Sequence, residues 1–132
     1  MPLKVSIVTP EREVEVCDDA TLVIAKGIEG DVGIMPGHAP MLIGLAQYPT
    51  QLILQRESRR DTVLIDGGFL QVKDDSLIVL AEYGVLPAEL DPAQVESEAA
   101  ELRTRLQAEA ESEELNRQLQ RREGLLKLLQ VG

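Results

Sequence analysis

Apolar and polar side chains alternate over short stretches in the first 86 residues of the chain. This period of two is typical of strands that bury one face and expose the other. Residues 3–9 and 13–17 show it most clearly, and we expect their apolar side chains to point inward. These side chains are Leu3, Val5, Ile7, Val14 and Val16. Further strands are predicted at residues 21–25, 43–46, 51–55, 62–65, 69–72 and 77–80.

Turn-forming residues separate these runs, and they favour one fold class. We expect turns at Asp18-Asp19, at Pro49-Thr50 and at Asp66-Gly67-Gly68. The last of these is a hairpin signal, and the strand that follows it is expected to pair with the strand at 77–80. Many short strands at close spacing predict an N-terminal β-sandwich of about ten strands, or a flattened barrel, over residues 1–86.

The stretch from residue 27 to residue 42 interrupts the alternation. It reads GIEGDVGIMPGHAPML and holds four of the ten glycines and two of the seven prolines. Glycine permits positive φ and close backbone approach, whereas proline fixes φ and removes a donor. Because apolar residues are interspersed with them, we expect a shaped loop with specified bends rather than a flexible linker.

After the predicted sandwich, the apolar spacing becomes helical. Asp91 is a good N-cap, Pro92 suits the first helical position, and Gln94 can complete a capping box. Two thin apolar stripes follow, and between them Ser112 can cap a second helix after a break near residues 111–114. The stripes consist of Val95, Ala99, Leu102 and Leu106, and of Leu115, Leu119, Leu126 and Leu129.

These stripes predict a C-terminal α-helical hairpin over residues 87–132. One continuous helix of roughly 55–60 Å, at ~1.5 Å per residue, is the alternative. About eight small aliphatic side chains bury little surface against a backbone cost of roughly 1–2 kcal/mol per ordered residue. The hairpin should therefore be marginal by itself, should need the sandwich or another subunit, and should be able to exchange partners.

The composition excludes several classes of function. A net charge of −10, from 23 acidic and 13 basic residues, argues against nucleic acid and against anchoring on anionic lipid. No signal peptide is visible and no apolar run approaches the ~18 residues of a membrane span, so we expect a soluble protein that meets a membrane only through a partner. With one phenylalanine and two tyrosines, the core should be aliphatic.

Residues that suggest chemistry have simpler interpretations. His38 is the obvious candidate base, but no nucleophile elbow such as Gly-x-Ser-x-Gly accompanies it, so a loop or interface histidine is favoured. Gly27, Gly30 and Gly33 match neither the dinucleotide fingerprint nor the phosphate loop. Cys17 follows a strand pattern and predicts a half-buried small hydrophobe. One cysteine and one histidine are a poor supply of metal ligands, so we expect no metal, no cofactor and no catalytic site.

Basic residues collect on the second predicted helix, within an acidic protein. They are Arg117, Arg121, Arg122 and Lys127. Two interpretations remain open: ion pairs with the glutamates of the preceding helix, or a basic face kept for an acidic partner.

Three segments resemble the ε subunit of F-type ATP synthases. They read GDVGIMPGHAPML (30–42), DGGFLQV (66–72) and LIVLAE (77–82). The resemblance implies a β-sandwich with a helical hairpin, acting as a rotor element that couples proton flow to ATP synthesis without an active site. In this family the sandwich packs on the γ subunit and stands on the ring of c subunits. The resemblance thus implies a peripheral place at the cytoplasmic face of the plasma membrane, or of an equivalent energy-transducing membrane.

The resemblance also implies contact residues. The family's ring-contacting loops match residues 29–38, which assigns Glu29, Asp31 and His38 to the c-ring. In many bacterial relatives the hairpin extends along γ into the catalytic head, where its basic residues meet acidic segments of the β subunit, beside α, and block ATP hydrolysis. The matching residues here are Arg117, Arg121, Arg122 and Lys127.

Some relatives bind ATP between the helices through a pattern resembling Ile/Leu-Asp-x-x-Arg-Ala. This chain reads LDPAQV at the matching position, which keeps Asp91 but replaces the arginine by Gln94. We therefore expect no nucleotide site and interpret Asp91 as a helix cap.

Two other functions are compatible with the residues. One is an unrelated non-catalytic adaptor whose sandwich binds one partner and whose tail forms a coiled coil with another. The second is a small enzyme that uses His38. Stable binding to γ distinguishes an ε subunit from the adaptor, and an unchanged activity of the complex after His38→Ala would argue against the enzyme.

Overall fold

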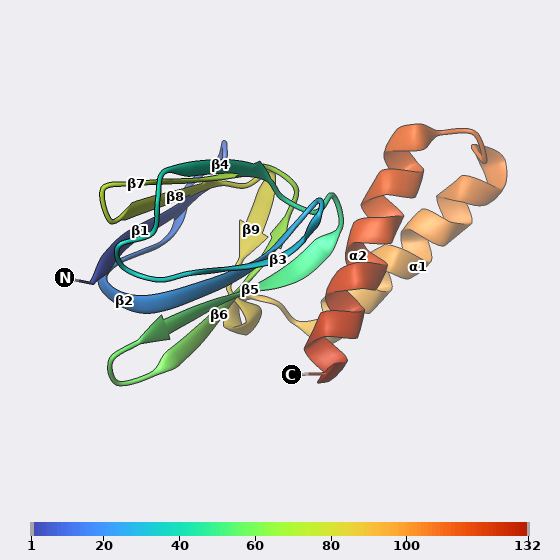
Figure 1. The fold of residues 1–132 in the computed structure, drawn as a ribbon. Helices are drawn as coiled ribbons and strands as arrows, with labels where there is room; N and C mark the ends of the chain where they lie inside the picture. The colour runs from blue at the N-terminus through green and yellow to red at the C-terminus, as the bar shows by residue number, and fades with distance from the viewer. Residues whose placement is uncertain (1, 132) are drawn as a thin grey trace.

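The computed structural model describes residues 2–131, in which a β-sandwich is followed by a helical hairpin (Figure 1). The predicted fold class is confirmed. Within the described residues the strands are β1 (Leu3–Val8), β2 (Glu13–Gly27), β3 (Gly30–Ile34), β4 (Met41–Gly44), β5 (Pro49–Arg56), β6 (Arg60–Asp66), β7 (Phe69–Lys73), β8 (Ser76–Leu80) and β9 (Tyr83–Val85). The C-terminal part comprises the 3-10 turn η1 (Pro87–Glu89) and the helices α1 (Pro92–Ala108) and α2 (Glu113–Val131).

The long strand β2 belongs to both layers of the sandwich. Its first half pairs with β1, and its second half pairs with β3 on one side and β5 on the other. The strand order β4-β7-β8-β1-β2-β5-β6-β9 therefore folds over at β2, with β3 beside its second half (Figure 1). Strand pairs in the described residues are antiparallel except for β1 with β8, which is parallel. The core lies between the two layers.

The predicted turn at Asp18-Asp19 is wrong, because β2 continues through both residues. The register against β1 shifts between Cys17 and Ala20, so β2 accommodates an extra residue at this point. Such a bulge increases the local twist and bends the strand. A bend within one strand, rather than a turn between two strands, thus leads the chain from one layer to the other. This continuity is one reason why the described residues form nine strands rather than about ten.

The predicted orientation is right for Val14 and wrong for Val16. Val14 is 8% exposed and Cys17 is 7% exposed, whereas Val16 is 51% exposed. The β1–β2 register skips Val14, which is a second irregularity in this pair. Because a bulge shifts the alternation by one residue, the side chain of Val16 points away from the core.

The stretch at 27–42 is only partly a loop. The strand β3 returns antiparallel along β2, with Gly27 opposite Gly30 at the turn. A side chain at Gly27 would place its Cβ 3.0 Å from the Gly30 carbonyl oxygen, so this turn needs glycine. Residues 35–40 form the remaining loop between β3 and β4, and the Gly37 N–H ties it to the Asp75 carboxylate at 2.6 Å.

The Asp66-Gly67-Gly68 signal does not form a hairpin. The strand β6 before it pairs with β5 and β9, whereas β7 after it pairs with β4 and β8. The two glycines instead carry the chain from one layer to the other, and a side chain at Gly68 would collide with the Leu80 carbonyl oxygen. The predicted pairing of residues 69–72 with 77–80 is confirmed as β7 with β8.

Buried aliphatic side chains from both layers form one continuous core. Its most buried members, each at most 1% exposed, include Leu3, Val5, Ile7, Val23, Ile34, Leu52, Leu54, Val63, Ile65, Leu70, Val72, Leu77 and Val79. The prediction of an aliphatic core is confirmed, since Phe69 is 57% exposed and both tyrosines lie outside this cluster.

The two helices of the hairpin begin at the positions that their predicted capping residues indicated. The Asp91 carboxylate accepts from the Ala93 backbone N–H at 3.0 Å, with Pro92 in the first helical position. The Ser112 hydroxyl accepts from the Leu115 N–H at 3.2 Å at the start of α2. Two separate helices over the described residues exclude the single continuous helix.

Candidate functional site

The hairpin contacts the sandwich through a small apolar cluster. Leu125 of α2 is 3% exposed and belongs to a cluster with Leu64 of β6 and Val85 of β9. Partly buried side chains border it, namely Tyr83, Leu90, Leu128 and Leu129. The cluster is separate from the sandwich core. We call it the docking cluster.

Beside this cluster, α2 lies unusually close to β5. A Cβ at Gly124 would lie 2.8 Å from Cγ and 2.9 Å from Cδ of Pro49. Glycine within a helix costs about 1 kcal/mol relative to alanine. The close contact with the Pro49 ring gives a physical reason for glycine at position 124. Pro49 itself is the first residue of β5 rather than the predicted break, and a proline is tolerated at that position of a strand.

Two arginines of α2 pair with carboxylates of the sandwich. The Arg121 Nε donates to Asp66 Oδ2 at 2.9 Å, and the two side chains are only 21% and 11% exposed. The Arg121 guanidinium also lies 4.7 Å from the centroid of the Tyr83 ring. Arg117 Nη2 donates to Glu82 Oε2 at 2.6 Å at a more exposed position. Burial raises the pKa of the Tyr83 hydroxyl.

The other two basic residues of α2 behave differently. Arg122 Nε lies 3.5 Å from Glu98 Oε1 of α1, too far for a good hydrogen bond, and this buried atom has no hydrogen-bond partner in the described residues, whereas Arg122 Nη1 donates to the Gln118 carbonyl at 3.3 Å. Lys127 is exposed and makes no ion pair with a carboxylate of the described residues. Pairing with the preceding helix thus accounts for Arg122 alone. Neither interpretation of the sequence anticipated that the sandwich itself engages Arg117 and Arg121.

The three residues assigned to the c-ring by resemblance do not form one cluster. Glu29 lies in the turn between β2 and β3, and Asp31 lies next to that turn; both are exposed. His38 follows the opposite end of β3, which at about 3.3 Å per residue is roughly 16 Å long. The ring of His38 donates from Nδ1 to the Ala39 carbonyl at 2.7 Å, as a loop histidine does.

A second surface lies on the outer face of the layer that contains β4, β7, β8 and β1. Residues paired across neighbouring strands share a face, and the register places five exposed apolar side chains on this face. Two rows cross the sheet: Phe69 lies opposite Leu80, while the adjacent row runs through Leu42, Gln71, Ile78, Ser6 and Val16. Their exposed fractions are 57% for Phe69, 55% for Leu80, 67% for Leu42, 40% for Ile78 and 51% for Val16. We call this surface the outer apolar face.

The sequence reading missed this surface, although a signal for it is present. Residues 77–80 read LIVL, an apolar run without alternation. Such a run is typical of a strand that is covered on both faces. Leu77 and Val79 fill the core, so Ile78 and Leu80 point to the other side of the sheet, where no part of residues 2–131 covers them.

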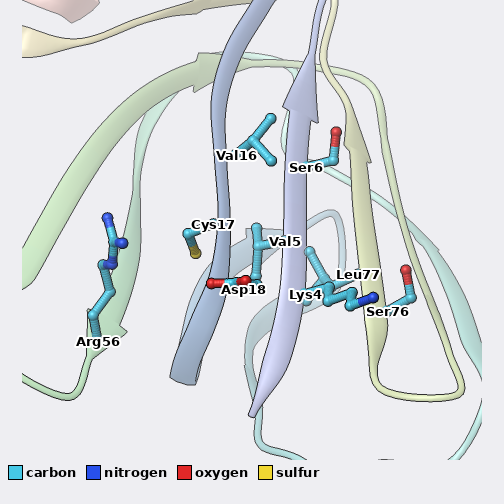
Figure 2. Close-up of a pocket in the computed structure, with 9 residues that line it drawn as sticks. All are labelled: Lys4, Val5, Ser6, Val16, Cys17, Asp18, Arg56, Ser76 and Leu77. Carbon is cyan, nitrogen blue, oxygen red and sulfur yellow. The ribbon is translucent and has the colours of Figure 1, made fainter.

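A cavity of about 530 Å³ borders the outer apolar face at Val16 (Figure 2). Lys4 and Ser76 lie on one side of it and Arg56 lies on the other, across β1 and β2. Arg56 Nε is already held by Asp19 Oδ1 at 2.7 Å. Burial raises the pKa of the Cys17 thiol in its wall. These features are typical of a surface hollow, not of a catalytic pocket.

Within the described residues, no group of three or more histidine, cysteine, aspartate and glutamate side chains is placed to hold a metal ion. The carboxylate of Asp91 is used by the helix cap, and Gln94 is exposed. None of the helices within residues 2–131 combines the length and the apolar content that crossing a bilayer requires. The fold defines a small two-part protein: a β-sandwich with exposed apolar side chains on its outer face, and a helical hairpin that contacts the sandwich through a small cluster.

The chain belongs to the ATP synthase delta/epsilon chain family. The sequence profile of that family, described as ATP synthase, Delta/Epsilon chain, beta-sandwich domain, matches residues 2–87. The resemblance inferred from the sequence is thereby confirmed. Epsilon chains of ATP synthase are non-catalytic subunits, and this chain is accordingly not an enzyme.

Bacterial relatives support the assignment beyond the sandwich. The ATP synthase epsilon chain of Desulforudis audaxviator is 40% identical over 105 residues, which cover 80% of this chain and 74% of the relative. The epsilon chain of Streptomyces coelicolor is 38% identical over 111 residues, covering 83% of this chain and 86% of the relative. Both matches are longer than the sandwich and extend into the hairpin.

Solved structures support the fold over nearly the whole chain. A chain of the mitochondrial ATP synthase of Euglena gracilis superimposes with a TM-score of 0.70 at 19% identity, covering 98% of this chain and 80% of that one. A chain from the central stalk and c-ring of the Tetrahymena thermophila enzyme gives 0.55 at 20% identity, covering 72% and 70%. At these identities the likeness concerns the fold.

Proposed function

We propose that the chain is the ε subunit of the central stalk of an F-type ATP synthase, where it acts as a rotor element that couples proton flow to ATP synthesis. In this proposal the sandwich binds the γ subunit and stands on the ring of c subunits. The chain is then peripheral, at the cytoplasmic face of the plasma membrane or of an equivalent energy-transducing membrane. Family membership and the neighbour described as central stalk and c-ring support this role.

The observation that carries the proposal is the outer apolar face. Contiguous exposed apolar side chains on a folded domain mark a surface that another protein covers. Aromatic anchors such as Phe69 contribute strongly to such interfaces. We assign this face to γ, and we assign the polar turn with Glu29 and Asp31 to the ring, where exposed carboxylates suit polar loops. His38 lies at the other end of β3 and contacts the ring only if the ring spans both ends.

Binding of the purified γ subunit tests the γ assignment directly. Replacing Phe69 and Leu80 by serine should weaken binding about 10- to 100-fold, because both side chains lose their buried area in the interface. Ile28→Ser is the matched control, since Ile28 is 65% exposed but lies in the turn between β2 and β3. Equal binding by the double variant and the control would contradict the assignment. If even the unaltered chain fails to bind γ, the adaptor hypothesis is preferred.

The hairpin is proposed to inhibit wasteful ATP hydrolysis by the catalytic head. Its basic residues, Arg117, Arg121, Arg122 and Lys127, then meet acidic segments of the β subunit, beside α. Hydrolysis by a head that lacks this chain is the assay, with the full chain or residues 1–86 added back. Inhibition by the full chain alone supports the regulatory role. If both forms bind and neither inhibits, the hairpin is structural.

Lys127→Ala is the cleaner variant for this assay. The structure ties Arg121 to Asp66, so Arg121→Ala changes both hairpin docking and any contact with the head. Lys127 is exposed and takes no part in the contact with the sandwich. Its replacement should reduce inhibition several-fold while binding to γ is unchanged. Inhibition that is equal to that of the unaltered chain would remove Lys127 from the proposed inhibitory contact.

A further inference from the structure

The contact residues of α2 form a single stripe along the helix. Positions 117, 121, 124, 125 and 128 follow the spacing of four, three, one and three residues that keeps side chains on one helical face. The stripe carries two arginines, one glycine and two leucines. On the sandwich, carboxylates pair with the arginines, the ring of Pro49 contacts the glycine, and apolar side chains contact the leucines. The contact between hairpin and sandwich is therefore specific in geometry, although it is small in area.

We infer that Asp66 and Glu82 form a carboxylate latch, which holds α2 on the sandwich and withholds Arg121 and Arg117 from acidic partners. The latch is the pair of contacts Asp66–Arg121 and Glu82–Arg117. The sandwich carboxylates engage Arg121 Nε and Arg117 Nη2, so a carboxylate of a partner must compete with them for these donors. The existence of the latch stands on the structure alone, while its effect on inhibition rests on the proposed function.

The latch is suited to exchange rather than to permanent attachment. A partly buried ion pair contributes little net free energy, because the desolvation of both charges offsets most of their attraction. Replacing the carboxylate of Asp66 by another carboxylate therefore changes the free energy little, whereas removing it without replacement leaves Arg121 beside Tyr83 unpaired. An acidic segment can thus release the hairpin, and an apolar or basic segment cannot.

The close approach at Gly124 sets the distance at which the latch can close. Gly124 lies three residues after Arg121 and one residue before Leu125, and it brings α2 against the Pro49 ring. A side chain at this position must push the helix away from β5. Because Arg121 and Leu125 flank this point on the same face, both the Asp66 contact and the docking cluster should loosen together.

Hydrogen exchange in the isolated full chain tests the latch without any other subunit. Asp66→Asn and Glu82→Gln should each speed exchange of the α2 amides, by about tenfold and about threefold respectively, because the more buried pair restricts opening more. Exchange of the β1, β2 and β8 amides should not change. Glu96→Gln is the matched control, since it removes a pair with Arg103 inside the hairpin. Unchanged α2 exchange in both latch variants would overturn the inference.

Gly124→Ala gives a second test that does not alter a charge. Alanine raises the intrinsic stability of the helix, so an effect of propensity alone would slow exchange of the α2 amides. The latch geometry predicts the opposite, a several-fold acceleration, because the new Cβ collides with Pro49. This variant also keeps the inference testable if Asp66→Asn disturbs folding of the sandwich. Slower exchange in Gly124→Ala would overturn the role of the close approach.

The consequence for regulation is measured in the complete catalytic head. If the hairpin inhibits, Asp66→Asn should lower the concentration of chain needed for half-maximal inhibition by about threefold or more, because the unlatched state is more populated. Weaker inhibition by this variant would contradict the inference that the latch keeps Arg121 and Arg117 from acidic partners. An unaltered chain that does not inhibit at all would refute the proposed function, and the exchange results would still decide whether the latch exists.

Discussion

The sandwich and the hairpin are stabilised in different ways. The sandwich buries one continuous aliphatic cluster with members from seven of the nine strands in the described residues, and partly buried side chains of β4 pack against it. Among residues 87–130, the buried apolar side chains of the hairpin are Val95, Ala99 and Leu102 on α1 and Leu115 and Leu125 on α2. Since burial of apolar surface is the dominant favourable term in folding, the sandwich is expected to be stable alone, whereas the hairpin depends on what it packs against.

The backbone adds a second difference between the two regions. A strand satisfies its N–H and C=O groups through neighbouring strands, so it cannot leave the sheet without exposing unpaired groups. A helix satisfies them internally, apart from its ends, which Asp91 and Ser112 cap here. The hairpin can therefore leave the sandwich while losing only the docking cluster and the latch. The comparison gives a physical reason for the proposal that the hairpin, rather than a strand, exchanges partners.

The largest expected effect concerns the core of the sandwich. Leu54→Ala should lower the free energy of unfolding by about 2–5 kcal/mol, because Leu54 is fully buried and its removal leaves a cavity. Leu42→Ala, on the outer apolar face, is the control and should change it by at most about 0.5 kcal/mol. Urea denaturation of the isolated chain measures both. A similar effect of the two substitutions would contradict the contrast between core and outer face.

Removal of the whole hairpin should have a smaller effect. A chain cut after Leu86 should remain a folded sandwich that joins the complex, since the main core contains no residue of α1 or α2. Its free energy of unfolding should fall by about 2–4 kcal/mol, because Leu64 and Val85 lose their cover. Circular dichroism and urea denaturation measure this. Loss of the β signal would show that the sandwich depends on the hairpin.

Leu125→Ala should loosen the hairpin alone. Leu125 is 3% exposed and contacts the sandwich through the docking cluster, so its truncation should reduce the free energy of docking by about 1–3 kcal/mol. Hydrogen exchange of the α2 amides should accelerate, while the amides of β1 and β2 should keep their protection. Equal acceleration in both regions would mean that hairpin and sandwich open as one unit.

The smallest effect concerns the linker at η1 and its response to pH. Hydrogen bonds from Arg12, at 2.6 and 2.9 Å, and then from the Leu86 N–H lower the pKa of Glu89 from its ordinary value of 4.5. This contribution to stability is complete above pH 4.5 and is lost as the pH falls through the lowered pKa. Both side chains are exposed, so the effect should be small. When Glu89 is protonated at acid pH, we expect the chemical shift of the Leu86 amide to change. Glu89→Gln should abolish this change, and an identical pH titration of the Leu86 amide in the variant would contradict the assignment to Glu89.

Local pattern was informative wherever neighbouring residues decide the conformation. The alternation at 3–9, the pairing of 69–72 with 77–80, and the caps Asp91 and Ser112 all follow from contacts within a few residues, and the structure confirms them. The turn expected at Asp18-Asp19 is wrong because β2 runs through both residues, with its pairing to β1 shifted between Cys17 and Ala20.

Contacts between distant residues were not predictable in this way. The latch joins residues 55 positions apart, Asp66 and Arg121, and 35 positions apart, Glu82 and Arg117. The excess of acidic residues in the sequence showed that carboxylates are available to pair with the arginines. It did not show which carboxylate lies nearest to each arginine in the fold. The outer apolar face likewise emerges only when the register of five strands, β4, β7, β8, β1 and β2, places its members on one face.

The amino-acid sequence by itself determined the two-part architecture, the aliphatic core, the caps of the helices and the family. These properties depend on the period of apolar residues, on composition and on local hydrogen bonding, all of which are set within short segments of the chain. Only the tertiary structure decided that β2 links both layers, that Gly124 contacts Pro49 and that Asp66 holds Arg121. Such pairings arise from the packing of remote elements, and their distances exist only once the sandwich has formed.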